Sequence, residues 1–177
     1  ENLKPEESLN TDIGFSTNLS AYNLNLSGSI FNNVIENRIA FSGGGYNQVT
    51  VKEKREGYEI DAEYEVSKST YAKFSYTNVT DGKGGHVRKI PKNKFSIIVN
   101  SELTQKIDSS IKLTSVSDLK DVSTLPDYNV MDAKFSYKLE DYNVTLKIDN
   151  VFDEQYQVVK GYGTADRSFY IGLDGEF

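Results

Sequence analysis

The sequence has 177 residues, enough for one domain of ordinary size, and its 26 acidic and 20 basic residues give a net charge of −6. This acidic balance argues against a nucleic-acid partner, because no basic field could neutralise phosphates. The absence of cysteine excludes disulfides, zinc–thiolate sites and thiol nucleophiles.

The apolar content is low for a membrane protein built from helices. Hydrophobic residues make up 37% of the sequence, the mean hydropathy is −0.52, and no run approaches the ~20 apolar residues that a spanning helix needs. The search for a long apolar run does not detect a β-barrel, because only alternate residues of each strand face lipid. Aromatic residues, at 12%, suit the interfacial girdles of a barrel and equally a soluble β-sandwich. No secretory signal is visible, so we expect a mature or cut piece of a longer protein.

Alternation of apolar and polar residues along almost the whole chain predicts an all-β protein of about nine strands. In chain order we expect strands over 8–20, from 23 onward, and over 49–66, 69–78, 94–102, 109–116, 128–139, 142–148 and 169–177. Tyr142, Val144, Leu146 and Ile148 illustrate the pattern, since polar residues separate each pair. No segment shows a convincing helical period, so we expect almost no helix.

The connections between these strands alternate in length. Short ones are expected at 21–22, 67–68, 105–108 and 140–141, and long ones at 32–48, 79–93, 117–127 and 153–166. Outer-membrane barrels have this arrangement, with short periplasmic turns and longer extracellular loops. The carboxyl terminus falls on the short-turn side and is therefore predicted to be periplasmic.

An odd number of strands cannot close an up-and-down antiparallel ring, because the first and last strands run in the same direction. The two open edges of such a sheet would leave backbone N–H and C=O groups without partners in lipid, which is too costly. We therefore expect residues 1–177 to be the last strands of a larger transmembrane β-barrel.

Several motifs follow one another in the order found in TonB-dependent outer-membrane receptors, which the chain resembles. They are Asn2-Leu3-Lys4-Pro5-Glu6, Gly57-Tyr58-Glu59, Tyr128–Asp132, Asp149–Tyr156, Gly161-Tyr162 and Arg167–Leu173 with the final Phe177. Asp166 and Gly175 depart from the family pattern, at positions where Gly and an aromatic residue are usual. Asp149–Glu154 could also bind calcium, but its match to the family motif favours a structural role at a strand end.

The resemblance implies the carboxyl-terminal part of a barrel of about 22 strands whose lumen holds a plug domain, here on another chain or another part of the protein. It implies a bacterial outer-membrane importer for a scarce, bulky ligand, a cobalamin or a ferric siderophore, energised by TonB acting on the plug. The stretch from Gly161 to Arg167 and the compact loops resemble those of cobalamin receptors slightly more than those of siderophore receptors. In this family the outward-facing residues of the last strand, Phe169, Ile171, Leu173 and Phe177, form the outer-membrane assembly signal.

Charged residues gather on the polar faces of the expected strands. Glu59, Asp61, Glu63 and Glu65 alternate along one strand; they could form a metal site or meet a basic plug, but we favour a hydrated lumen wall. Alternate carboxylates spread by ~7 Å per pair, too far for one metal, so we expect no metal site. The polar faces of other strands carry lysines that could balance this row, namely Lys73, Lys112, Lys134, Lys138 and Lys147.

Ligand contacts are expected on the long-connection side. The candidates are Tyr46, His86, Arg88, Tyr128, Tyr156 and Tyr162. His86 is the single histidine, and its Gly- and Lys-rich surroundings favour a solvated loop over a ligand contact. No serine, carboxylate or cysteine is spaced to work with it, so neither catalysis nor a bound cofactor is expected.

Two other interpretations remain open at this point. One is a self-standing, plug-less membrane barrel or pore, which would need further strands or oligomeric closure. The other is a soluble β-sheet binding protein, which would dissolve without detergent.

Overall fold

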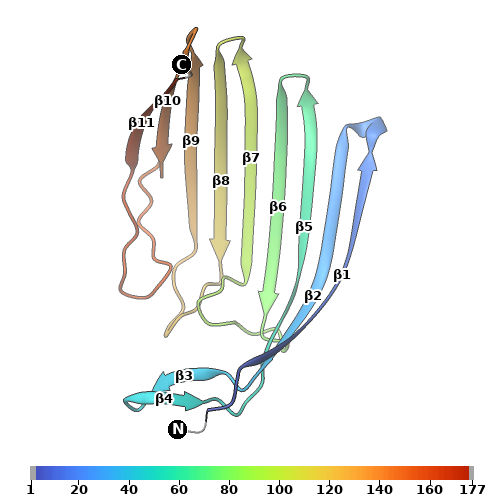
Figure 1. Cartoon of the computed structure of the whole chain (residues 1–177), viewed down its shortest axis with the longest axis vertical. Helices are drawn as coiled ribbons and strands as arrows, with labels where there is room; N and C mark the ends of the chain where they lie inside the picture. Colours follow the sequence, from blue (N-terminus) through green and yellow to red (C-terminus); the bar gives the residue numbers. More distant parts are fainter. Residues whose placement is uncertain (1–2, 176–177) are drawn as a thin grey trace.

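The computed structural model describes residues 3–175. Nine strands form one antiparallel sheet in which each strand pairs with its neighbour along the chain (Figure 1). They are β1 (Glu7–Leu19), β2 (Leu24–Glu36), β5 (Glu53–Ser67), β6 (Thr70–Thr80), β7 (Asn93–Thr104), β8 (Ile107–Ser117), β9 (Tyr128–Lys138), β10 (Tyr142–Asp149) and β11 (Ser168–Gly175). The sheet therefore has the up-and-down topology expected from the alternation.

The nine expected strands are confirmed within residues 3–175, with small shifts at their ends; Phe177, the expected end of the last one, lies outside the described residues. The expected connection over 32–48 is partly wrong. Strand β2 runs on to Glu36, and β3 (Ile39–Ser42) and β4 (Gly45–Gln48) then form a separate hairpin. Its turn is made by Gly43 and Gly44, whose φ angles of 61° and 84° belong to the left-handed region that glycine adopts freely. The hairpin lies across the long-connection end at a steep angle to the sheet (Figure 1).

Helix is nearly absent from the described part of the chain, as expected. The structure over residues 3–175 contains one 3₁₀ turn, Ser20–Tyr22, between β1 and β2. Within the same residues no helix is long and apolar enough to cross a membrane.

One face of the sheet is apolar from edge to edge. The register places Ile13 opposite Ile30 between β1 and β2, and Leu146 opposite Ile171 between β10 and β11. These side chains are not covered by the chain: Ile13 is 69% exposed and Ile171 83%. So large an exposed apolar surface on a β-sheet is what lipid contact requires.

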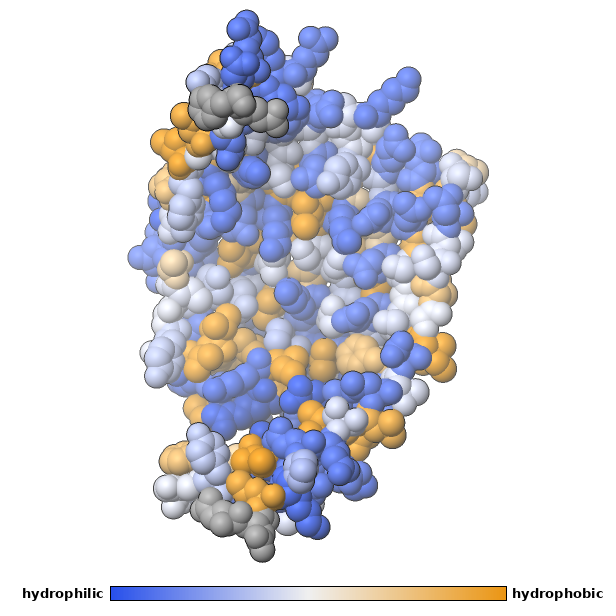
Figure 2. Space-filling model, viewed as in Figure 1, coloured by the Kyte–Doolittle hydropathy of each residue, from blue (hydrophilic) through white to orange (hydrophobic). Residues whose placement is uncertain are grey.

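The opposite face is polar. It carries the alternating acidic residues of β5 and the lysines of β6 to β10, because these positions fall on the other side of each pleat. Figure 2 shows this face as largely hydrophilic, with hydrophobic residues gathered towards the long connections. The only buried apolar cluster among the described residues lies there too, as detailed below.

All long connections leave the same end of the sheet, and all short turns leave the other (Figure 1). Three strands stop at the long-connection end with an Asn or Asp in the left-handed conformation. Asn37, Asp118 and Asn150 follow β2, β8 and β10 with φ angles of 55°, 56° and 54°. Asn and Asp tolerate this conformation better than other residues with a side chain, so they end these strands.

The sheet is open: β1 and β11 are its two edges, and they do not pair with each other in the structure of residues 3–175. The chain thus forms part of a barrel wall rather than a closed barrel.

Candidate functional site

Three long connections pack together at one end of the sheet around a single carboxylate. Asp121, in the connection 118–127, accepts a hydrogen bond at 2.8 Å from Nε of Arg88, in the connection 81–92. Its second oxygen accepts the backbone N–H of Lys160, in the connection 150–167, at 3.2 Å. The Asp121 side chain is only 4% exposed. One buried acid therefore joins all three segments. Two of them, 81–92 and 118–127, are also joined by backbone hydrogen bonds from Lys89 to Lys120 at 2.8 Å and from Lys92 to Asp118 at 3.3 Å.

The arginine also sets the charge state of this acid. The hydrogen bond from Arg88, more than any other contact, holds the pKa of the Asp121 carboxyl below its ordinary value, and the Lys160 N–H adds to the effect. Burial opposes them by raising the pKa. Asp121 is therefore ionised at neutral pH, which its role as a double acceptor requires.

A small apolar core lies beneath this junction. It contains residues of β8, β9 and the connection 118–127, namely Val116, Leu119, Leu125, Tyr128 and Val130. The ring of Tyr156, from the connection 150–167, stacks on that of Tyr128 at 4.2 Å and 27°. The connections are thus packed against the inside of the wall rather than left free in solvent.

The connection after β10 is shaped by its own side chains. Asn150 accepts the backbone N–H of Glu154 at 2.8 Å and donates to the Glu154 carbonyl at 3.0 Å. Asp153 accepts the backbone N–H of Arg167 at 2.8 Å. These contacts agree with the strand-end structural role expected for this motif, and within residues 3–175 no group of three or more His, Cys, Asp or Glu side chains could hold a metal ion.

A cavity of about 580 Å³ opens under the connections, on the polar face of β7 to β11. Its wall combines the Tyr128–Tyr156 stack with charged residues of both signs, namely Lys89, Lys94, Lys112, Lys147, Asp132, Asp149 and Asp166. A cavity of this size is in the range of small-molecule sites. It is the candidate binding site at the long-connection end.

The structure brings together four of the six predicted contact residues. Arg88, Tyr128 and Tyr156 belong to the junction or its core, and His86 lies beside them, with Nδ1 at 3.1 Å from the carbonyl oxygen of Asp118. Tyr162 is in the connection 150–167 and is 72% exposed. Tyr46 lies apart on the β3–β4 hairpin, where its ring contacts Phe41 edge-on at 5.4 Å. Whether any of the six touches a ligand stays a prediction.

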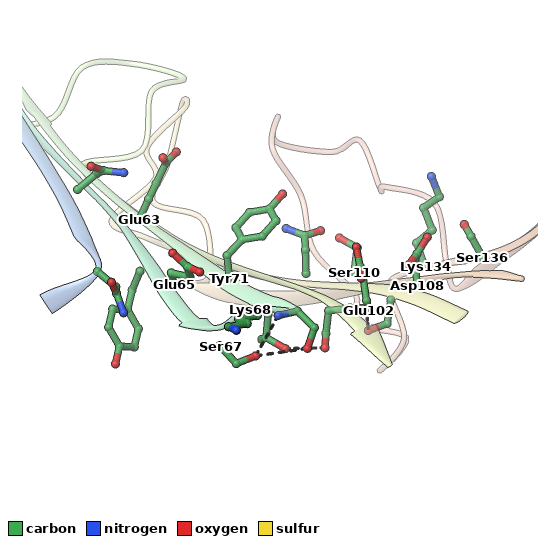
Figure 3. Close-up of a pocket in the computed structure, with 18 of the residues that line it drawn as sticks. Glu63, Glu65, Ser67, Lys68, Tyr71, Glu102, Asp108, Ser110, Lys134 and Ser136 are labelled. Carbon is green, nitrogen blue, oxygen red and sulfur yellow. Dashed lines mark hydrogen bonds between the residues drawn. The ribbon is translucent and has the colours of Figure 1, made fainter. Parts of the chain in front are cut away.

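The polar face carries a second cavity, of about 800 Å³, at the short-turn end. Figure 3 shows Glu63, Tyr71, Ser110 and Lys134 projecting from the same side of the sheet towards this space. Its wall is rich in Ser and Asn and includes Tyr64 and Tyr71, whose rings make no stacking contact with each other among the described residues. It suits a hydrated contact with another polar surface better than the capture of a small ligand.

The expected balance between the acidic row and the lysines is seen at one pair. Lys73 binds Glu63 at 3.1 Å between β6 and β5. The other two paired lysines bind acids outside the acidic row: Lys138 binds Asp108 of β8, and Lys147 binds Asp149 of its own strand, both at 2.8 Å. Lys112 and Lys134 make no ion pair in the described part of the chain.

The junction acid, Asp121, and the cavity lysines Lys89 and Lys94 were not among the residues singled out from the sequence. Asp121 stands in a polar connection where no periodic pattern distinguishes it. Lys94 could have been found from the alternation of β7. The pattern that puts Phe95 on the apolar face puts Lys94, one residue earlier, on the polar face.

Comparisons with known proteins agree with this architecture. The family model described as TonB dependent receptor-like, beta-barrel, matches residues 1–151. The vitamin B12 transporter BtuB of Vibrio cholerae is 24% identical over 191 residues, covering 99% of this chain and 30% of the relative, and its Vibrio vulnificus counterpart is 22% identical over the same shares. The chain therefore spans under a third of the length of these curated relatives.

Solved structures show the same fold. The ferric enterobactin receptor PfeA of Pseudomonas aeruginosa superposes with a TM-score of 0.79 at 18% identity, over 99% of this chain and 32% of that one. The ferric-catecholate import receptor Fiu of Escherichia coli gives 0.74 at 22% identity, over 99% and 28%. The copper transporter OprC gives 0.81 at 16% identity, over 100% and 32%.

Proposed function

Because the chain belongs to the family of TonB-dependent receptor-like β-barrels, whose members are bacterial outer-membrane proteins, we propose that it forms the carboxyl-terminal part of the wall of an active importer. The ligand is a scarce, bulky molecule, a cobalamin or a ferric siderophore. The rest of the barrel and a plug domain lie outside residues 1–177, and TonB acts through the plug. The short turns, and with them the carboxyl terminus, are periplasmic.

The observation that carries this proposal is the division of the sheet into two faces with all long connections at one end. The apolar face supports lipid contact over all nine strands. The polar face supports a hydrated lumen, and the packed connections offer a cavity at its mouth. An importer needs these three surfaces in this arrangement.

The role of the chain in the import cycle is passive. We assign it no step that moves a proton or a group, because the matching family model describes receptor-like β-barrels. The wall keeps the lumen separate from lipid, and the connections present their side chains to the ligand. Energy enters through the plug.

The proposal is tested by uptake into cells. A strain lacking the complete receptor and the same strain carrying it are compared with labelled cyanocobalamin and labelled ferric siderophores, with and without TonB. We expect accumulation of one of these ligands only when receptor and TonB are both present. Uptake that persists without TonB would favour the plug-less pore, and recovery of the receptor without detergent would favour the soluble binding protein.

A further inference from the structure

The lipid-facing side of the sheet differs between its two ends. Towards the short turns it presents apolar and aromatic side chains, of which Leu19 and Tyr64 are exposed. Towards the long connections the same face carries amides and hydroxyls. Asn78 of β6, Asn93 of β7 and Ser117 of β8 lie opposite one another there. They occupy positions at which the alternation of each strand points outwards, away from the lumen.

These outward-facing groups form one hydrogen-bonded network. The Oδ1 atom of Asn93 accepts from Nδ2 of Asn78 at 2.7 Å and from the hydroxyl of Tyr76 at 2.9 Å. Its Nδ2 atom donates to the hydroxyl of Ser117 at 3.3 Å and to a carboxylate oxygen of Asp118 at 3.2 Å. The network links β6, β7 and β8 across the outer face of the wall.

A second polar row lies beside the network, nearer the long connections. It contains Asn32 of β2, Glu56 of β5 and Thr80 of β6, which face one another in register. Amides and carboxylates are costly to place in hydrocarbon, so both rows belong in the headgroup layer of a membrane. We call the six residues the polar band: Asn32, Glu56, Asn78, Thr80, Asn93 and Ser117.

The lysines next to the polar band are neutralised within the chain. Lys54 binds Glu56, and Lys52 binds Glu36, both at 2.6 Å. The polar band therefore offers hydrogen bonds rather than excess positive charge. The rings of Tyr58 and Tyr76 lie beside it on the same face, 5.8 Å apart. Such rings combine an apolar body with a polar tip and suit the boundary between headgroups and hydrocarbon.

A groove of about 460 Å³ joins the polar band to the apolar part of this face. Its polar lining includes Asn32, Glu56, Asn78 and Thr80, and its apolar lining includes Ile13, Ile30 and Tyr58. Ile13 is 69% exposed and Ile30 61%, so the groove opens outwards. One groove thus brings hydrogen-bonding groups next to an aliphatic wall, which is the arrangement that an amphiphile with a polar head and an acyl chain requires.

We infer that this groove binds a glycolipid of the outer leaflet, with an acyl chain along Ile13 and Ile30 and sugar hydroxyls on the polar band. Water alone would satisfy the amides but would leave the apolar half of the groove unfilled. A phospholipid would fill that half but has few hydroxyls for the band. The inference rests on the proposed orientation, in which the long connections lie outside the cell. It adds a lipid partner on the outer surface of the wall, separate from any ligand in the lumen.

The test uses the complete receptor, purified in detergent, with two probes: deep-rough lipopolysaccharide, which has a short sugar headgroup, and phosphatidylglycerol. Native mass spectrometry measures the binding of each lipid at low and high salt. One variant removes amides of the band, Asn78→Leu with Asn93→Leu, and another fills the apolar half of the groove, Ile30→Trp.

The matched control lies on the same face of the same two strands, at the short-turn end. There the hydroxyls of Thr70 in β6 and Ser101 in β7 lie 2.7 Å apart and share a hydrogen bond. The control variant, Thr70→Val with Ser101→Ala, removes that bond and leaves the groove intact. The heat-dependent electrophoretic mobility of each variant checks that the barrel is folded.

We expect the glycolipid to bind the parent receptor with little dependence on salt, because hydrogen bonds and apolar contacts hold it. Its dissociation constant should rise about tenfold or more in the double Leu variant and in Ile30→Trp, and less than about threefold in the control. Phosphatidylglycerol should bind more weakly and equally to all four proteins.

Equal glycolipid binding by the parent and both groove variants would overturn the inference, and so would equal affinity for the two lipids. Release of the glycolipid by salt would assign the binding to lysines instead. If the double Leu variant does not fold, Ile30→Trp decides alone. Labelling of the long connections from outside the cell separates the two proposals: if they are reached there and no glycolipid binds, only this inference fails. If they are reached only from the periplasm, the proposed orientation fails as well.

Discussion

Asp121 links three of the long connections. Its two oxygens hold Arg88 and the Lys160 backbone, and its own N–H donates to the carbonyl of Ser123 at 3.0 Å. A buried acid with these partners is costly to neutralise, because protonation removes acceptor capacity and leaves Arg88 without its anion. One ionised side chain is thus shared by the contacts of three connections, beside the apolar core and the backbone hydrogen bonds that also hold them.

Acid should loosen this junction. Since the folded state holds the pKa of Asp121 below its ordinary value, the carboxylate stabilises the packed connections above the unfolded pKa of about 3.9. That contribution is lost as the pH falls through the lower folded pKa. We expect amide exchange over 118–127 and 150–167, corrected for intrinsic rates, to stay slow at pH 5–7 and to accelerate below about pH 4.

The variant Asp121→Asn should show fast exchange in both connections already at neutral pH and lose the acid-dependent step. Asp141→Asn, in the short turn before β10, is the control and should behave as the parent. Unchanged protection in Asp121→Asn would mean that the apolar core alone orders these connections.

At the scale of the elements, each strand has one face towards lipid and one towards the lumen, and successive side chains point to opposite faces. This is why alternation alone predicted nine strands correctly. The β3–β4 hairpin was not predicted, because its strands of four residues are too short to show a two-residue period. The Gly43-Gly44 pair between Phe41 and Tyr46 was nevertheless a turn signal. The Asp121 junction could not be predicted, because contacts between distant connections leave no local pattern.

A charge on the lipid face should be far more harmful than one on the lumen face of the same strand. Ile13→Lys places an ammonium group in the apolar surface near the middle of β1 and should destabilise the barrel by about 2–4 kcal/mol. Ser16→Lys, on the polar face of β1, should cost less than about 1 kcal/mol. Urea-dependent folding of the complete receptor into lipid vesicles measures the difference. Equal costs would mean that the two faces are misassigned.

At the scale of the whole molecule, the alternation of long and short connections defines two ends that face different compartments. Chemical labelling can test this directly, because the chain has no cysteine of its own. Val122 lies in the long connection 118–127 and is 69% exposed, whereas Lys106 lies in the short turn between β7 and β8.

A membrane-impermeant maleimide added to intact cells should label Val122→Cys in the complete receptor. It should reach Lys106→Cys only after the outer membrane is permeabilised. The reverse pattern would place the long connections in the periplasm and invert the proposed orientation. The labelling is read against a parent receptor stripped of any cysteines outside this chain.

The separation of apolar and polar residues onto two faces has a consequence for how such a chain reaches its membrane. Before the strands pair, apolar residues never follow one another for long enough to act as a stop signal in the inner membrane. The extended chain can therefore be secreted and kept dispersed in water. Its apolar surface forms only when neighbouring strands pair and align their side chains. The same sequence is therefore compatible with water during secretion and with lipid once it is folded in the membrane.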